Sequence, residues 1–508
     1  MRSRLLLLLA SSPLALAGCS VGPDYVKPTT AISPAYKEQP AQAPGIGSAA
    51  DGTLWKPARP SDPTIATNWW EAFGDPELSS LEEQVGAANQ DLKAAEARYR
   101  EARALIGYAR ADEFPTIGVG GDGASLKNSA DAPYSPSRNL RATGDLALTT
   151  DLSYEVDLWG RIHREVTAAT ANAQASAADL AAARLSLQAE LALDYFNLRS
   201  DDALQRLLDD TVTSYAESLQ LAQVRLDRGA APASDVAQAK SQLDTAQVQD
   251  TDIGVERAQF EHAIAVLIGK PPASFTLAPA PLKEAPPTIP VGVPSDLLQR
   301  RPDIAAAERR AAQANEQIGI AVSAYYPSLS LSGFAGAEGT SPANWFDWPS
   351  LLWAVGTSVS ETIFDGGRRD AKTDAARADY DVAIANYRQT TLTAFRQVED
   401  NLAALRILDR ETRQQDEAVG SAKTNLDLFT ARYLGGRDSY LQVTTAQTSY
   451  LQNQRNAVEI ERRRMKASVR LVKALGGGWD GDLSVEPDQA HKRSVFTQTT
   501  AGQEVSGH

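Results

Sequence analysis

An internal duplication limits what this chain can fold into more than any other feature of its sequence. The segment that begins at Gln90 reappears at Pro302, a constant 212 residues later. A second segment, which begins at Arg225, reappears at Arg432 with an offset of 207. The chain therefore contains two copies of a unit of about 200 residues, joined by a Pro-rich segment at 271–293. Any fold must accommodate this unit twice in tandem.

Each unit shows the same order of expected elements: a helix, two strands, a very long helix and a returning helix. In the first unit, a helix of about 35 residues is expected from near Glu77 to Asp112, and Pro115 follows its end because proline lacks a donor N–H. The very long helices are expected at 161–227 and 368–433. At about 1.5 Å per residue they reach on the order of 100 Å. A Gly-containing turn and a helix of about 40 residues follow each, which predicts long antiparallel coiled-coil helices.

The stretch at 144–157 alternates strictly, which is typical of a strand with two different faces. One face is apolar and carries Leu146, Leu148, Leu152, Tyr154 and Val156. The opposite face carries the acidic residues Asp145, Asp151, Glu155 and Asp157. The counterpart in the second unit, expected at 353–364, keeps the alternation apart from Glu361, and a Gly-rich strand precedes each of the two.

Two strands per unit give four strands per chain, and four strands cannot close a barrel. Open strand edges are not tolerated in lipid, and the smallest outer-membrane barrels have about eight strands. Several chains must therefore share one barrel, with the apolar face in lipid and the acidic face around water. The four carboxylates at 145, 151, 155 and 157 are predicted to line this lumen.

The N-terminus indicates export from the cytoplasm. Residues 1–18 have two arginines, an apolar run and small residues, which is typical of a cleaved signal peptide. The end of this stretch resembles the bacterial lipobox, and that resemblance implies a lipid on Cys19, which is the only cysteine. The alternative is an ordinary signal peptide that happens to contain a cysteine. Residues 19–68 are then a lipidated N-terminal segment.

Composition and motifs argue against an enzyme and against nucleic-acid binding. The net charge is −14, whereas nucleic acid requires basic patches. No two of the four histidines have metal-ligand spacing, and no nucleophile elbow occurs. The Gly-rich stretch at 118–123 lies in a strand position and lacks the helix that follows a phosphate-binding loop. No metal or cofactor is expected other than the covalent lipid on Cys19.

Several long blocks resemble one family of bacterial transport proteins. Residues 22–28, 69–104, 153–161, 294–333 and 363–369 are similar to the outer-membrane factors of tripartite efflux systems, in the lipoprotein branch called OprM/NodT of the TolC-like superfamily. The resemblance implies a homotrimer in which three chains form a 12-stranded barrel in the outer membrane and a helical tunnel across the periplasm.

The same resemblance implies partners and a function. The partners are a periplasmic adaptor protein and an inner-membrane pump of the resistance-nodulation-division class. The function is a passive duct that carries small molecules, such as drugs, toxic compounds or metals, out of the cell. Two other interpretations stay open: an exit duct for type I protein secretion, and a lipid-anchored periplasmic coiled-coil structural protein. We expect TolC-like repeats at 69–270 and 294–479 and a disordered tail at 480–508.

The two helix-to-helix turns are the candidate docking sites for the adaptor at the periplasmic tip. The candidate residues are Arg225, Arg228, Gly229, Arg432, Gly435, Gly436 and Arg437. The alternative is that the glycines are ordinary helix C-caps and the arginines are solvated. The resemblance places the channel gate after the second turn, at Leu441 and Thr445. Thr445 stands where the family carries an acid, and Asp438 is the nearest acid to it. Leu441 is either an apolar plug or coiled-coil core.

Overall fold

The structure is a computed structural model that describes residues 20–38, 67–127, 129, 142–282, 285–291 and 294–485. The predicted signal peptide, Cys19 and the tail beyond residue 485 lie outside the described residues. None of the described helices is both long enough and apolar enough to cross a membrane.

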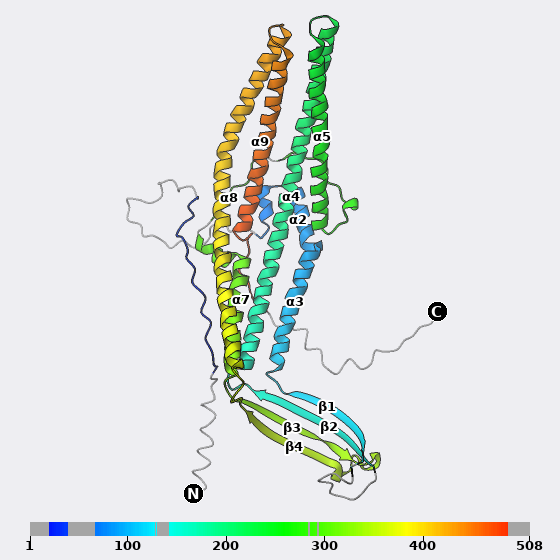
Figure 1. Ribbon diagram of the computed structural model, residues 1–508, viewed down its shortest axis with the longest axis vertical. Coiled ribbons are helices and arrows are strands. Elements are labelled where there is room, and N and C mark those ends of the chain that lie inside the picture. Colours follow the sequence, from blue (N-terminus) through cyan, green and yellow to red (C-terminus); the bar gives the residue numbers. More distant parts are fainter. Residues whose placement is uncertain are drawn as a thin grey trace, which may run out of the picture.

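The predicted tandem repeat of helix, two strands, long helix and returning helix is confirmed (Figure 1). The first repeat consists of α2 (Pro76–Ala88), α3 (Gln90–Ala111), β1 (Thr116–Leu126), β2 (Thr143–Val156), α4 (Arg161–Asp227) and α5 (Ala233–Leu267). The second consists of α6 (Leu297–Arg300), α7 (Pro302–Ser323), β3 (Ser328–Gly339), β4 (Leu351–Ser360), α8 (Arg368–Leu434) and α9 (Tyr440–Ala474). The long helices α4 and α8 have 67 residues each, and α8 ends at Leu434, one residue beyond its predicted end. The returning helices have 35 residues each, somewhat fewer than the predicted length of about 40.

The prediction of one continuous helix from Glu77 to Asp112 is wrong, because Asn89 divides this segment into α2 and α3. The backbone of Asn89 is extended, with φ −61° and ψ 130°. Its side-chain oxygen accepts a hydrogen bond from the N–H of Leu92 at 2.9 Å, which caps α3. Its amide nitrogen donates to the carbonyl of Leu267 at 2.8 Å. A polar side chain with two backbone partners therefore breaks a segment whose composition is helical throughout.

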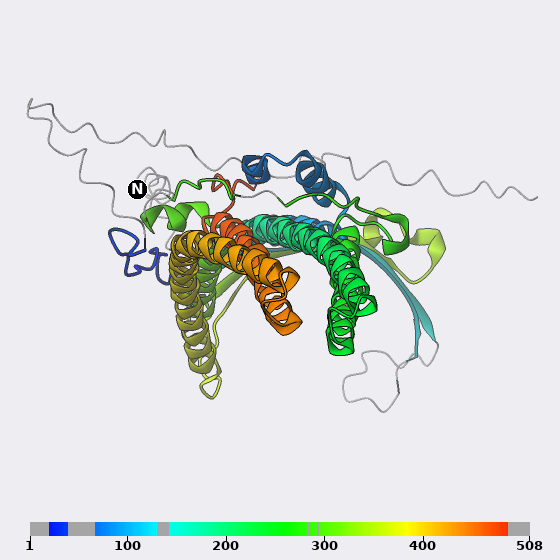
Figure 2. The same ribbon diagram turned by 90° about the horizontal axis from the view of Figure 1, so that it is seen from above.

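The sheet lies at one end of the molecule and the two helical hairpins end together at the other (Figure 1). Near the sheet, α3, α4, α7 and α8 pack side by side, whereas near the tips the row consists of α5, α4, α9 and α8. Seen along the long axis, these helices form an open curved row (Figure 2). Each hairpin contributes two helices to this row, and α4 and α9 join the two repeats.

A hydrophobic core lies midway along the helices. Trp69, Trp70 and Phe73 pack there with Phe196 of α4 and Val469 of α9. The cluster also includes residues of α2 and α5, so it packs α2, α4, α5 and α9 against the segment 69–73 that precedes α2. Burial of large aromatic and aliphatic side chains contributes about 2 kcal/mol each, so this cluster anchors helices of both repeats to one another.

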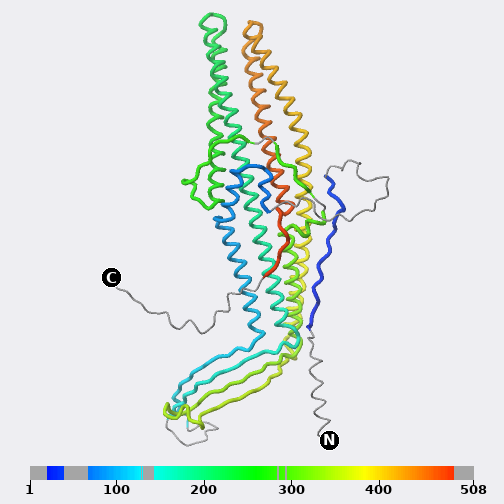
Figure 3. Tube along the Cα trace, turned by 180° about the vertical axis from the view of Figure 1, so that it is seen from behind, coloured from blue at the N-terminus to red at the C-terminus, as the bar shows by residue number. Residues whose placement is uncertain are grey.

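Residues 20–38 form an extended strap beside α7 and α8 (Figure 3). The hydroxyl of Tyr25 donates to Glu308 at 2.6 Å, and Tyr36 is buried against Tyr387 and neighbouring apolar residues. The carboxylate of Glu399 accepts from the N–H groups of residues 37 and 38. At the other end of the chain, residues 480–485 of the predicted tail are described and Val485 packs near α3, whereas residues 486–508 lie outside the described residues.

Candidate functional site

The four strands form one antiparallel sheet in the order β1-β2-β3-β4. Consecutive strands are neighbours throughout, so the hydrogen-bonding edges of β1 and β4 stay free in the single chain. A sheet of this length with two free edges is a template for pairing with further strands.

One face of the sheet is apolar across all four strands. Residues that pair directly in an antiparallel ladder share a face. Leu152 pairs with Ile117 on one side and with Gly333 on the other, and Gly333 in turn pairs with Val355. The face comprises Ile117, Val119, Leu146, Leu148, Leu152, Tyr154, Val156, Leu329, Leu331, Leu351, Trp353, Val355 and Val359. Val355 is 81 % exposed, although a water-facing sheet would place polar residues here.

The opposite face is polar and acidic. Asp151 lies over the place where Gly118 of β1 has no side chain, and a Cβ atom at position 118 would approach its Oδ1 to 2.8 Å. A larger residue at 118 would therefore collide with the carboxylate. Asp145, Asp151 and Glu155 share this face with Asp122, Glu338 and serines of β3 and β4, while Leu126, Phe334 and Leu352 are its large apolar members. Sequence alternation alone identified the three β2 carboxylates of this set.

Two of the predicted lumen carboxylates have partners at the junction with α4. Glu155 forms an ion pair with Arg161 at 2.8 Å. Asp157 lies one residue beyond β2 and accepts a hydrogen bond from the N–H of His163 at 2.8 Å. Asp157 therefore caps the first turn of α4 rather than lying in the sheet, because a carboxylate there pairs with free N–H groups at a helix start.

The two tip turns have the same backbone. Gly229 and Gly436 have φ values of 70° and 69°, which an L side chain rarely adopts. In the first turn, the N–H of Ala230 bonds the carbonyl of Arg225 at 2.8 Å, and the second turn repeats this bond. These are Schellman caps. Gly435 differs, because its φ is −78° and nothing in its conformation requires glycine.

The predicted arginines divide into two groups. Arg225 crosses from α4 to the second hairpin, where it lies 4.6 Å over the ring of Tyr433 and donates to the carbonyl of Leu434 at 3.0 Å. Arg432 forms an ion pair with Asp438 across its own turn. Arg228 and Arg437 are exposed and form no ion pair with any described residue. The structure therefore pairs Arg432 with Asp438 within the second turn, and it places Arg225 against Tyr433 and Leu434 of the second hairpin.

A tyrosine pair at the tip escaped the sequence analysis. The hydroxyl of Tyr433 donates to the carboxylate of Asp235 on α5 at 3.2 Å, and its ring packs edge-on against Tyr440 at 5.2 Å. Burial raises the pKa of Tyr440 to about 12. Two tyrosines that flank a Gly-rich turn are a pattern from which the aromatic contact could have been predicted. Asp235 could not have been predicted in this way, because the equivalent position in the second repeat, 442, carries no acidic residue. Together with Arg225, these residues form a latch between the hairpins.

The three gate candidates lie beside this latch. Leu441 is 54 % exposed and follows the buried Tyr440. The hydroxyl of Thr445 donates to the carbonyl of Leu441 at 2.9 Å, so this threonine is satisfied within its own helix. Neither Leu441 nor Thr445 carries a charge, and the carboxylate of Asp438 forms an ion pair with Arg432.

The chain matches known proteins over most of its length. The family described as "Outer membrane efflux protein" matches residues 81–270 and 293–477. The toluene efflux pump outer membrane protein TtgF of Pseudomonas putida is 33 % identical over 93 % of this chain and 97 % of that protein. The outer membrane protein OprJ of Pseudomonas aeruginosa is 32 % identical over 93 % and 95 %.

A solved structure agrees with these relatives. The Campylobacter jejuni CmeC outer membrane channel superposes with a TM-score of 0.83 at 25 % identity, over 92 % of this chain and 97 % of that one. The predicted TolC-like fold is therefore confirmed. Sequence and structure together show that this chain belongs to the outer membrane efflux protein family.

Proposed function

We propose that this chain is the outer-membrane duct of a tripartite efflux pump, assembled from three copies and carrying small molecules from an inner-membrane transporter to the outside. The two-faced sheet with two free edges carries the proposal. Its apolar face suits lipid, its acidic face suits water, and its edges require further copies. The duct is passive and is not an enzyme, and energy comes from the pump.

The helices support a ring of copies joined head to tail. On α5, at one edge of the row, Val248, Val255 and Val266 are all exposed, and at about 100° per residue they fall in one stripe. On α8, at the other edge, the exposed large apolar residues are Val382, Leu392, Ile407, Leu428 and Leu434. Two different surfaces that meet between copies generate a closed ring when the rotation from one copy to the next closes, and the curvature of the row favours such closure. The number three comes from the resemblance to the family.

Cysteine pairs across the sheet edges test this assembly. Thr116 begins β1 and Ser360 ends β4, and both lie on the polar face at the helix end of the sheet. We expect Thr116→Cys combined with Ser360→Cys, or with Ser358→Cys one register step away, to give covalent oligomers on oxidation.

Ser153→Cys combined with Ser360→Cys is the matched control, because Ser153 lies at the same height on the interior strand β2 and cannot reach another copy. Monomers alone for both edge pairs, in membranes that contain the protein, would contradict the proposal.

We propose that Cys19 carries the lipid and that the outer membrane holds the sheet. Val21 donates its N–H to the carbonyl of Trp159 at 3.1 Å, and Ser20 lies against Gly160. This contact places residue 20 at the junction between β2 and α4, next to the proposed membrane level. A lipid on the preceding residue would therefore reach the inner leaflet without strain in the strap.

The tips are the proposed docking surface for a periplasmic adaptor, and the latch is the proposed closure. Opening requires the hairpins to separate, which breaks the contacts of Tyr433 with Asp235. We expect Tyr433→Phe to raise the resting ion conductance in planar lipid severalfold, because a hydrogen bond to a charged group contributes about 1.5–3 kcal/mol. Tyr450→Phe, farther along α9, is the control. Equal conductance in the two variants would refute this role of Tyr433.

The proposed cargo is small and apolar to moderately polar. The relatives' names refer to toluene, solvents and antibiotics. Profiling the susceptibility of a deletion strain to these compounds, with and without the gene restored, tests the cargo class directly.

A further inference from the structure

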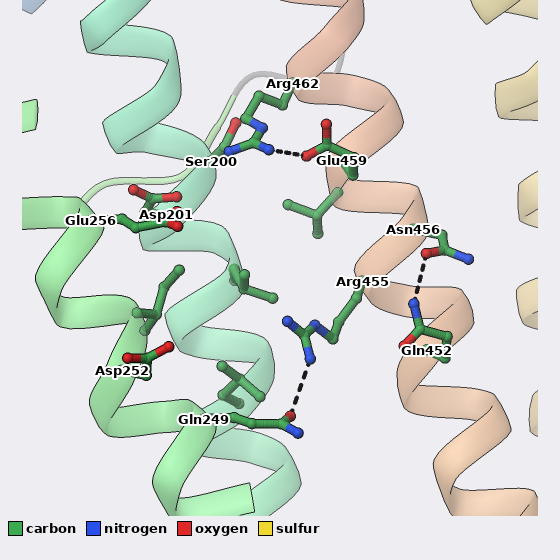
Figure 4. Close-up of a pocket in the computed structure, with 14 residues that line it drawn as sticks. Ser200, Asp201, Gln249, Asp252, Glu256, Gln452, Arg455, Asn456, Glu459 and Arg462 are labelled. Atoms are coloured by element: carbon green, nitrogen blue, oxygen red, sulfur yellow. Dashed lines mark hydrogen bonds and ion pairs between the residues drawn. The ribbon is translucent and has the colours of Figure 1, made fainter.

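A polar pocket of about 420 Å³ lies between α4, α5 and α9 (Figure 4). Its lining residues lie in the middle part of these helices, away from the tip turns. Its α4–α5 wall carries Asp201, Asp252 and Glu256. None of these three carboxylates has a hydrogen bond or ion pair with any described residue. By contrast, the neighbouring Asp202 is fully paired with Arg199 and Arg257. Unpaired carboxylates thus gather on one wall of one cavity.

Asp201 gives this cavity a buried carboxylate that has no partner in the part of the chain that the structure describes. Asp201 is only 2 % exposed, and its Oδ2 atom is buried and accepts no hydrogen bond from any described residue. Leaving a buried polar atom unsatisfied costs about 1–3 kcal/mol, and more when the group is charged. Burial, reinforced by the nearby Glu256, raises the pKa of Asp201 to about 7. Because Asp201 lines the pocket, a cation bound there would stabilise the ionised form of its carboxylate through the opposite charge.

The α9 wall narrows the choice of ligand. Arg455 bonds Gln249 at 3.1 Å and Arg462 pairs with Glu459, so both arginines are already engaged (Figure 4). With Glu459, the lining holds four carboxylates against two guanidinium groups, which leaves two negative charges when all are ionised. The described residues contain no cluster of three or more ligands suited to a metal ion. The charge balance therefore suits an organic dication.

The carboxylates are spread along the wall, and apolar side chains lie between them. Asp252 and Glu256 are one helical turn apart on α5, and Asp201 faces them from α4. Leu204, Leu208 and Ile253 complete this wall. Methylene groups of a ligand can contact these side chains while a charged group at each end meets a carboxylate. We propose that this pocket binds an aliphatic diammonium cation, of the class of α,ω-diaminoalkanes, where the helices of the two repeats meet.

Calorimetry with 1,4-diaminobutane on the assembled protein in detergent tests the proposal. We expect saturable binding that weakens at least tenfold for 1-aminobutane, which has one charge. Asp201→Asn and Glu256→Gln each weaken binding of the diamine at least tenfold. Asp244→Asn, at an exposed carboxylate on α5 outside the pocket, leaves it unchanged.

The pH dependence gives a second readout. The charged groups near Asp201 are Asp202 on α4, Glu256 and Arg257 on α5, and Arg462 on α9. Binding of a dication favours the ionised carboxylate, so affinity rises between pH 6 and pH 8 in the natural protein and loses this rise in Asp201→Asn. Absence of saturable binding, equal affinity for the monoamine, or unchanged affinity in the pocket variant Glu256→Gln would overturn the proposal. Binding is measured without transport, so a failure here leaves the duct itself untouched.

Discussion

Glu82 is a carboxylic acid in the middle of an apolar environment. It is fully buried on α2, and both of its carboxylate oxygens lack partners among the described residues. Burial raises its pKa to about 9, compared with an ordinary value near 4.5. The folded chain therefore keeps a proton that the unfolded chain releases, and stability falls as pH rises from about 4.5 to about 9, by about 1.4 kcal/mol per unit.

We expect Glu82→Gln to remove this dependence. The variant and the natural protein have similar stability near pH 5, and the variant becomes progressively more stable toward pH 9. Thermal unfolding at several pH values measures the difference. Glu83→Gln, at the exposed neighbouring position, serves as the control and should follow the natural protein. Parallel curves for the natural protein and Glu82→Gln would show that Glu82 is ionised in the fold.

The second tip turn contains two adjacent glycines, and only one of them has a backbone conformation that requires glycine. At Gly436 the left-handed backbone excludes an unstrained side chain, whereas Gly435 has an ordinary helical φ. We expect Gly436→Ala to destabilise the turn by about 1 kcal/mol and Gly435→Ala to be neutral or slightly stabilising. Hydrogen exchange of the tip amides measures both. Equal protection in the two variants would contradict the assigned cap.

Residue-level prediction from the sequence succeeded where a pattern repeats and failed where a partner comes from elsewhere. The turn glycines and the acidic strand face were readable from spacing alone. Tyr433 was missed because its partner Asp235 lies 198 residues away in the chain. Asn89 was missed because its break depends on the carbonyl of Leu267, which only the folded chain brings near. The sequence patterns that identify a strand face carry no information about such distant partners.

At the scale of elements, the two faces of β2 make opposite demands. Leu148 lies on the apolar face and Thr149 on the acidic face, one residue apart at the middle of the strand. We expect Leu148→Arg to block assembly in the membrane, because an arginine facing lipid at mid-depth costs about 2–4 kcal/mol in each copy. Thr149→Arg should assemble normally. Gel migration of outer-membrane extracts with and without heating measures the assembly of both variants. Assembly of Leu148→Arg together with failure of Thr149→Arg would mean that the apolar face of the sheet is not the face in lipid.

The elements differed in how far the sequence determined them. Both 67-residue helices were predicted to within a residue, because long uninterrupted segments of helix-forming residues end at clear glycine turns. The last strand was less well placed, since β4 ends at Ser360 and the expected strand continued to residue 364. Glu361, the single exception to the alternation, thus lies outside the sheet. An alternating pattern that continues into a loop gives no sign of where pairing stops.

At the scale of the molecule, one chain is an incomplete object. Its sheet has two free edges, its helical row is open, and apolar residues lie exposed at both ends of that row. The duplication explains this geometry: each repeat supplies the same curved segment of strands and helices, so a closed wall needs several repeats. Family membership and fold followed from the sequence, whereas the number of copies is a property of curvature that spacing does not encode.

The most direct test of the account is the mass and conductance of the purified protein. Multi-angle scattering in detergent should give a protein mass of three chains, with no free monomer at micromolar concentration. The same preparation should pass ions through planar lipid in discrete steps, and opening the latch by Tyr433→Phe should enlarge the open fraction. A monomeric mass together with an electrically silent bilayer would contradict the claim that several chains join their sheets into one water-filled wall.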